Sequence, residues 1–212
     1  MKKRENVRVC VPRYLQIGRG SLSELPEIIK ILGSIKSVLI VTDKQMVSFG
    51  YVKKLQEVLN KSGFKSDVFD ETVPDPTDIV VLKGIKFLEN CKSDAVIGFG
   101  GGSPIDTAKA IAAMSMHSKN IQDYKPPTMF DKKGLPIIAI PTTAGTGSEV
   151  THHAVIIDTN NNSFSINTGD NSITFANVTI ATPPANFPAL QVDDFQVFIN
   201  GLIVEASAIT SI

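Results

Sequence analysis

Two runs of small residues are the strongest candidates for chemistry in this sequence. Residues 98–109 read GFGGGSPIDTAK and place three glycines (100–102) before a predicted helix, with Ser103 as its N-cap and Pro104 in its first turn. Glycine has no Cβ atom, so an anion can approach the backbone, where the N–H groups and dipole of a helix N-terminus attract it. The run predicts a phosphate site, and the alternative is a tight strand-to-helix turn without a ligand.

The second run, residues 141–151, reads PTTAGTGSEVT and combines glycines with hydroxyl side chains. Hydroxyl groups both donate and accept hydrogen bonds, so their density suits a polar ligand with many hydrogen-bonding groups. Four of them are predicted binding residues: Thr142, Thr143, Thr146 and Ser148. Glu149 in the same run is more ordinarily an ion-pair partner than a catalytic base.

Asp43 is a third candidate, because it follows a continuous apolar run at residues 37–41. A carboxylate at the end of such a strand can accept hydrogen bonds from both hydroxyl groups of an adenosine ribose. The alternative is a solvated carboxylate. Ribose binding by Asp43 would disfavour a 2′-phosphate, so NAD is expected rather than NADP.

These residues lie on loops of a chain that alternates short apolar runs with helical patterns. Predicted strands cover residues 37–43, 65–69, 95–99 and 135–140, and predicted helices cover residues 49–62, 79–88 and 104–116. This order predicts an α/β fold with a Rossmann-like, doubly wound and mostly parallel sheet. Ligands bind beyond the carboxyl ends of such strands, so the site is expected on the loops after Val41, Phe99 and Ile140.

The composition changes after Thr159, and prolines at 183 and 184 suggest a domain boundary. Residues 1–184 are predicted to form a dinucleotide-binding domain, and residues 185–212 the beginning of a truncated or degenerate helical domain. The apolar stretch 193–212 is predicted to be helical, and its exposure would favour a homo-oligomer. Two further strands are predicted, at residues 164–167 and 178–181.

Composition excludes several classes of protein. The 21 Lys and Arg residues balance the 21 Asp and Glu residues, so no basic face for nucleic acid is expected. Cys10 and Cys91 have no metal-like spacing, which favours a reducing compartment. Apolar runs are far shorter than the ~20 residues that span a bilayer, so we expect a cytoplasmic protein without a membrane segment.

The two small-residue runs together closely resemble the iron-containing, or group III, alcohol dehydrogenase family. The resemblance extends from about Ile17 to Asp158, and it includes a Pro-Asp-Pro-Thr motif in which family members commonly have Asn at the position of Asp75. It implies an NAD-dependent alcohol dehydrogenase or aldehyde reductase, which transfers a hydride between nicotinamide and a small alcohol or aldehyde.

The resemblance also implies roles for the candidate residues. Asp43 would hold the adenosine ribose, the glycine run and Ser103 the pyrophosphate, and Val155 the nicotinamide ribose side. The hydroxyl residues of the second run would lie toward the nicotinamide. The implied cofactor-binding set is Asp43, Asp75, Gly100, Gly101, Gly102, Ser103, Asp106, Thr142, Thr143, Thr146, Ser148 and Val155.

Family members also hold a divalent iron or zinc ion, with an Asp and, four residues later, a His on the first helix after the boundary. An ungapped extension of the match brings Asn200 and Val204 to these positions, so we expect the metal ligands not to be preserved. His117 is interpreted as a structural residue at a helix end. His152 and His153 are also interpreted as structural and, in a strand, would point to opposite faces.

Two classes of function remain open on this basis. In the first, the chain is a family dehydrogenase or the cofactor-binding part of one. In the second, it is a non-catalytic nucleotide-binding or interaction module that keeps the same cofactor-binding residues. A third, narrower hypothesis is a metal-independent reductase that uses His152 or His153 as its proton donor.

Overall fold

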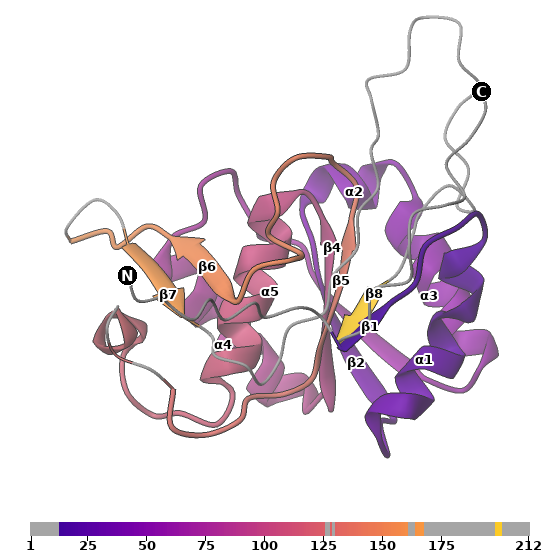
Figure 1. Ribbon diagram of the computed structural model, residues 1–212, viewed down its shortest axis with the longest axis horizontal. Coiled ribbons are helices and arrows are strands. Elements are labelled where there is room, and N and C mark those ends of the chain that lie inside the picture. Colours follow the sequence, from indigo (N-terminus) through magenta and orange to yellow (C-terminus); the bar gives the residue numbers. More distant parts are fainter. Residues whose placement is uncertain (1–12, 126–127, 129, 161–163, 168–197, 201–212) are drawn as a thin grey trace, which may run out of the picture.

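The computed structural model describes residues 13–125, 128, 130–160, 164–167 and 198–200. Its main element is a six-stranded sheet with the order β1-β8-β5-β4-β2-β3 (Figure 1). The four strands β3, β2, β4 and β5 are parallel, whereas β8 pairs antiparallel with β1 and β5. The bounds are β1 (Arg13–Leu15), β2 (Ser37–Val41), β3 (Lys65–Phe69), β4 (Ala95–Gly100), β5 (Ile137–Pro141) and β8 (Phe198–Asn200).

Helices cover both faces of this sheet, which confirms the predicted α/β architecture. In Figure 1, α1 and α3 lie on one side of the sheet and α4 and α5 on the other. A separate antiparallel pair, β6 (His153–Ile156) and β7 (Phe164–Asn167), lies beside α5. The helices are α1 (Leu25–Leu32), α2 (Lys44–Ser48), α3 (Tyr51–Lys61), α4 (Asp78–Cys91) and α5 (Gly102–Met114), with 3-10 turns at Ser21–Glu24 and Ile121–Tyr124.

The two-sided cover explains the uninterrupted apolar run of β2. Val38 and Ile40 belong to the core on the α1 and α3 side, whereas Leu39 and Val41 belong to the core on the α4 and α5 side. Successive side chains of a strand alternate between faces, so a strand buried on both faces needs apolar residues at every position. The same burial places the polar end of β2, and Asp43 after it, at the edge of the sheet.

Three local predictions are corrected or extended by the structure. The helix predicted over residues 49–62 is confirmed as α3, and a short helix that was not predicted, α2, precedes it; Gly50 between the two has a φ of 78°, a left-handed conformation that separates them. The helix predicted over residues 193–212 is wrong at residues 198–200, which form β8. The strand predicted at residues 164–167 is confirmed as β7, and the one at 178–181 lies outside the described residues.

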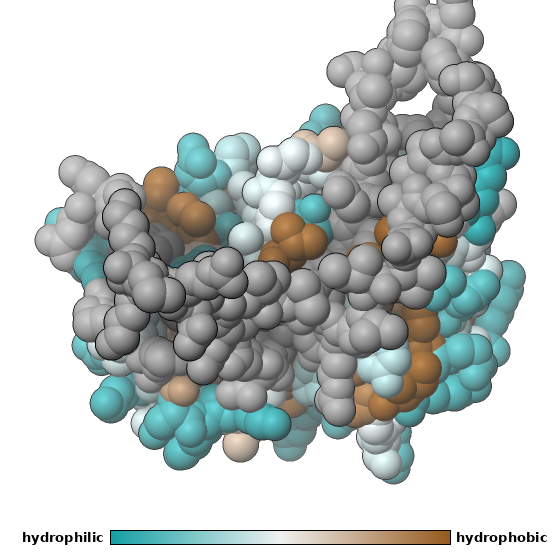
Figure 2. Space-filling view, in the orientation of Figure 1, coloured by the Kyte–Doolittle hydropathy of each residue, from teal (hydrophilic) through white to brown (hydrophobic). Residues whose placement is uncertain are grey.

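The face of the molecule shown in Figure 2 carries both hydrophobic and hydrophilic residues. Figure 2 shows hydrophobic residues on this face as separate patches among hydrophilic ones. Cys91 is a free, half-buried thiol, and Cys10 lies outside the described residues. No helix in the described part of the chain is both long enough and apolar enough to cross a membrane.

Asp94 joins the amino ends of β4 and β2, and we expect Asp94→Ala to lower the free energy of unfolding by about 1–3 kcal/mol at neutral pH. Its Oδ2 accepts hydrogen bonds from the backbone N–H groups of Lys36 (2.8 Å) and Ser37 (3.0 Å). The first of these bonds is the largest cause that lowers the pKa of the Asp94 carboxyl group below its ordinary 3.8.

Because that pKa is lowered in the fold, the stabilisation is present above pH 3.8 and is lost as the pH falls through the folded value. Urea unfolding of both proteins at neutral pH and over an acidic series measures the difference. A difference that stays constant down to the lowest pH would contradict the ionic role of Asp94.

Candidate functional site

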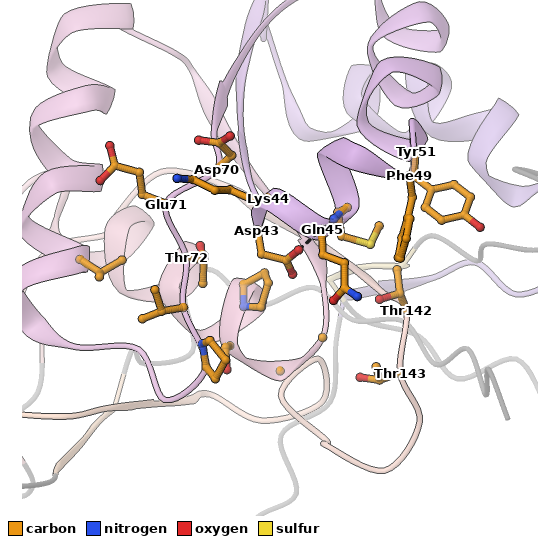
Figure 3. A pocket seen from close by; sticks show the side chains of 18 of the residues that line it. Asp43, Lys44, Gln45, Phe49, Tyr51, Asp70, Glu71, Thr72, Thr142 and Thr143 are labelled. Carbon is orange, nitrogen blue, oxygen red and sulfur yellow. Dashed lines mark hydrogen bonds between the residues drawn. The ribbon is translucent and has the colours of Figure 1, made fainter. Parts of the chain in front are cut away.

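A cavity of about 1180 Å³ opens beyond the carboxyl ends of the parallel strands (Figure 3). Four loops line it, namely those that follow β2, β3, β4 and β5. Three of these loops were predicted to carry the site because of their place at strand ends, and the loop after β3 entered the prediction only through Asp75, which the family resemblance implied. Its lining includes Asp43, Lys44, Asp70, Glu71, Thr72, Lys83, Gly101, Gly102, Ser103, Thr142 and Thr143.

The cavity brings together half of the expected cofactor-binding residues. Six of the twelve line it: Asp43, Gly101, Gly102, Ser103, Thr142 and Thr143. The structure places the other six outside this lining: Asp75, Gly100, Asp106, Thr146, Ser148 and Val155. The sequence runs were therefore correct guides to the edge of the sheet, although membership of a run did not decide which side chains face the cavity.

Asp43 is the N-cap of α2 and also faces the cavity. Its Oδ1 accepts a hydrogen bond from the backbone N–H of Met46 at 2.9 Å. No described residue donates a hydrogen bond to the other oxygen, Oδ2. This oxygen lies 3.5 Å from the place where a Cβ atom of Gly100 would stand. One carboxylate oxygen thus fixes the local structure, while the second is available to a ligand.

The N-terminus of α5 forms the part of the cavity between Asp43 and the loop after β5. The expected N-cap at Ser103 is wrong, because the helix begins at Gly102 with Gly101 as its N-cap. Gly101 has no side chain, so no side-chain hydrogen bond caps this helix, whereas Asp43 and Thr77 cap α2 and α4. The N–H groups of the first turn therefore face the cavity without a side-chain acceptor.

The glycines before α5 also let two chain segments approach closely. Gly100 has a φ of 144°, and a Cβ atom there would lie 2.8 Å from Cγ of Pro104. A Cβ atom on Gly102 would lie 3.1 Å from Oγ of Ser148 and 3.2 Å from Cβ of Thr146. The glycine turn is thus packed directly against the hydroxyl loop of residues 142–151.

Charged side chains from the loop after β3 and from two helices form the opposite wall. Lys83 Nζ lies 2.8 Å from Glu71 Oε2, and this hydrogen bond is the largest cause that lowers the pKa of Glu71. In Figure 3 the Lys44 side chain extends toward Asp70 and Glu71. Thr72 Oγ1 is buried and has no hydrogen-bond partner among the described residues. Ligands bind beyond the carboxyl ends of parallel strands, and β3 is one of these strands. The same rule could therefore have predicted that the loop after β3 lines the cavity.

Four of the expected residues outside the lining have different surroundings. Thr146 Oγ1 donates to Glu149 Oε2 at 3.2 Å, and burial raises the pKa of the Glu149 carboxyl group. Ser148 is buried behind Gly102. Val155 is 58% exposed on β6, and Asp75 lies in an exposed turn with a φ of 51°.

Asp106 belongs to a buried ion pair on α5. Its Oδ1 lies 2.9 Å from Nζ of Lys109, and its Oδ2 accepts the backbone N–H of Val155 at 2.9 Å. Both side chains are almost completely buried. Lys109 lies in the glycine motif and had been assigned no role, because the sequence does not show which groups meet its ammonium.

The three histidines are not gathered into a cluster. His117 packs against Tyr124 and Phe130, and its Nε2 lies 3.0 Å from Asp131 Oδ1, which agrees with a structural role. His152 and His153 were expected on opposite faces, but His152 precedes β6 and the two rings lie 4.2 Å apart between centroids. Burial, followed by the nearby His152, lowers the pKa of His153 below 6.5, which favours a neutral imidazole at pH 7.

The described residues do not fit a divalent metal ion. Among them, no group of three or more His, Cys, Asp or Glu side chains is placed to hold one. Val204 lies outside the described residues, and only the backbone of Asn200 is described. The cofactor cradle is different, since the side-chain-free turn at Gly101 and Gly102 leaves room that a Cβ atom would fill.

Comparison with known proteins agrees with this geometry. The sequence profile named "Iron-containing alcohol dehydrogenase" matches residues 12–183. The chain belongs to this family. Within the iron-containing alcohol dehydrogenases, the matched region is the one homologous to the NAD-binding domain.

Named relatives of the family show how much of the chain is shared. Identity is 39% over 152 residues with Long-chain-alcohol dehydrogenase 1 of Geobacillus thermodenitrificans (strain NG80-2), a match that covers 70% of this chain and 38% of that protein. Identity is 38% over 148 residues with the NAD-dependent methanol dehydrogenase of Bacillus methanolicus, a match that covers 70% of this chain and 39% of that protein.

A solved structure has the same fold. The sulfoacetaldehyde reductase from Bifidobacterium kashiwanohense, in complex with NAD+, superposes with a TM-score of 0.73 and 29% identity. The superposition covers 82% of this chain and 46% of that one. The chain thus spans less than half the length of these iron-containing alcohol dehydrogenase relatives.

Proposed function

We propose that this chain binds NAD as the cofactor-binding part of an alcohol dehydrogenase or aldehyde reductase. The observation that carries the proposal is the position of the uncapped N-terminus of α5, which faces the same cavity as the carboxylate of Asp43. An anion site and a hydroxyl-binding carboxylate at the carboxyl edge of a parallel sheet are what a dinucleotide requires.

Each part of the cofactor then has a partner in the cavity. Asp43 accepts hydrogen bonds from the adenosine ribose, the N–H groups at Gly102 and Ser103 bind the pyrophosphate, and Thr142 with Thr143 lies toward the nicotinamide. The carboxylate of Asp43 disfavours a 2′-phosphate on this ribose, because two negative charges at that place repel each other, whereas Lys44 and Lys83 offset the charges of Asp70 and Glu71. The chemistry that the bound cofactor supplies is hydride exchange with a small alcohol or aldehyde.

A titration of the 212-residue chain with NADH in a calorimeter tests this proposal. We expect saturable binding with about one NADH per chain, and NADPH to bind at least about tenfold more weakly because its extra phosphate meets the carboxylate of Asp43, a difference of about 1.4 kcal/mol. Absence of heat with NADH over the whole titration would refute the proposal.

The second candidate is nucleotide binding without catalysis. It requires only the cavity and the uncapped N-terminus of α5, both of which lie in the described part of the chain. An assay of NAD reduction with a series of primary alcohols, with and without added Fe²⁺ or Zn²⁺, separates the two. Turnover by this chain would refute the second candidate and support the dehydrogenase.

A further inference from the structure

Lys109 is an unusual residue for the interior of a helix that packs on a sheet. Its side chain is 1% exposed, and burial is the largest cause that lowers its pKa, while the charge of Asp106 opposes this effect. An ammonium group without water needs compensation by charge and by hydrogen-bond acceptors. The acceptors that it finds come from one short stretch of the chain.

Nζ of Lys109 donates hydrogen bonds to backbone carbonyl groups within residues 148–153. It donates to Ser148 O at 2.7 Å, to Thr151 O at 3.4 Å and to His153 O, and it also lies 3.5 Å from the Thr151 hydroxyl oxygen. These residues follow Lys109 by 39 to 44 positions in the sequence. One side chain thus holds the end of the hydroxyl loop and the start of β6 against α5.

Asp106 adds a second connection between α5 and the same segment of the chain. One carboxylate oxygen meets Nζ of Lys109 and the other accepts the N–H of Val155, so the pair binds both acceptors and a donor of the segment. Glu149 also lies near enough to Lys109 for their charges to interact. The positive charge therefore faces two carboxyl groups and three carbonyl groups.

The hydroxyl loop has little regular structure to hold it in place. In the described part of the chain, two backbone hydrogen bonds involve residues 142–151: Thr142 N–H to Gly100 O at 2.8 Å and Val150 N–H to Gly147 O at 2.9 Å. The first fixes only the beginning of the loop. The side chain of Lys109 is therefore the main tie at its other end.

We infer that Lys109 is a positioning residue, which fixes the hydroxyl loop against the glycine turn of α5 and thereby shapes the nicotinamide half of the cofactor site. Gly102 packs closely against Ser148 and Thr146, so a shift of the hydroxyl loop changes its contact with the glycine turn at this point. The inference rests on the proposed function and adds to it a residue that lies outside the cavity lining and touches no ligand.

The first test compares two ligands that use different halves of the site. We expect Lys109→Met to weaken NADH binding by about tenfold or more, since three carbonyl groups lose their donor and the loop shifts. AMP reaches only the Asp43 side and the start of α5, so its affinity should change by less than about twofold. A purely structural loss would weaken both ligands alike, and that result would overturn the inference.

The second variant removes the charge that Lys109→Met leaves behind. Asp106→Asn combined with Lys109→Met removes the carboxylate that was paired with Nζ and keeps an oxygen for the Val155 N–H. Glu149 keeps its hydrogen bond from Thr146, and burial already raises its pKa, so the double variant should fold even where the single variant does not. The same loss of NADH affinity is expected. Wild-type affinity for NADH in this variant would overturn the inference. Lys30→Met, which breaks an exposed ion pair with Glu27, is the matched control and should bind both ligands normally.

Hydrogen exchange gives a readout that needs no ligand. In the double variant, amide exchange should accelerate in residues 142–155 and remain unchanged in β4, because the loop loses its tie while the sheet keeps its ladder. Unchanged exchange in residues 142–155 would overturn the inference even if the wild-type chain bound no NADH, an outcome that would refute the proposed function separately.

Discussion

Replacing Asp43 by asparagine is expected to weaken NADH binding by about tenfold to a hundredfold while the melting temperature stays unchanged. Asparagine caps a helix as well as aspartate does, so the bond from Met46 N–H to the side-chain oxygen is kept. The lost interaction is that of a charged acceptor with the ribose hydroxyl groups, about 1.5–3 kcal/mol. Calorimetric titration and thermal unfolding measure the two quantities.

Two further variants separate the cap from the ligand contact. Asp43→Ala should lose the same affinity and, in addition, about 1 kcal/mol of stability with the N-cap. Thr77→Ala removes the N-cap of α4, where Thr77 Oγ1 accepts from Val80 N–H at 3.3 Å, and should lower stability without changing NADH affinity. Equal NADH affinity in Asp43→Asn and the wild type would show that the ribose is held elsewhere.

Replacing Gly101 by threonine is expected to lower NADH affinity by roughly a hundredfold, about 2.7 kcal/mol, and to leave the fold intact. The backbone of Gly101, at φ −75° and ψ −165°, is open to any residue, and a Cβ atom would meet Thr143 Oγ1 at an ordinary 3.4 Å. A threonine hydroxyl would then accept from the Ser103 N–H, since Pro104 after it has no N–H, and this is one of the two groups proposed to bind the pyrophosphate.

Valine at the same position is the matched comparison, because it has the shape of threonine without the hydroxyl group. Gly101→Val should lose NADH affinity through its volume and should also be less stable than Gly101→Thr by about 1 kcal/mol, since valine is a poor N-cap. Titration and urea unfolding of the three proteins give both differences. Full NADH affinity in Gly101→Thr would remove the pyrophosphate from this helix terminus.

The core of the fold was predictable because it follows from short-range patterns. Val38 to Val41 are apolar at consecutive positions, which a strand needs when helices cover both of its faces. The helix α2 was not predicted, since it has only five residues and its boundary with α3 depends on the conformation of Gly50 and not on hydrophobic spacing. The strand β8 was missed for a related reason: its partners in β1 and β5 lie far away in the sequence.

The site was predictable to the level of its loops. Asp43 and the glycine run were identified because strand ends and side-chain-free turns carry their chemistry locally. The wall at Asp70 and Glu71 was missed, although the same rule covers β3. The buried pair of Asp106 and Lys109 could not be predicted, because its partners at Ser148, Thr151 and His153 are defined only when α5 packs on β6.

The sequence by itself determined the parallel α/β framework, the edge of the sheet at which the cavity opens, and the family to which these motifs point. The tertiary structure decided which residues of each motif face the cavity. Ser103 lines it, whereas Asp106, one helical turn further along α5, turns toward β6 and pairs with Lys109. The direction of a side chain on a helix depends on the helical phase and on the element packed against it, and the second of these arises only in the folded chain.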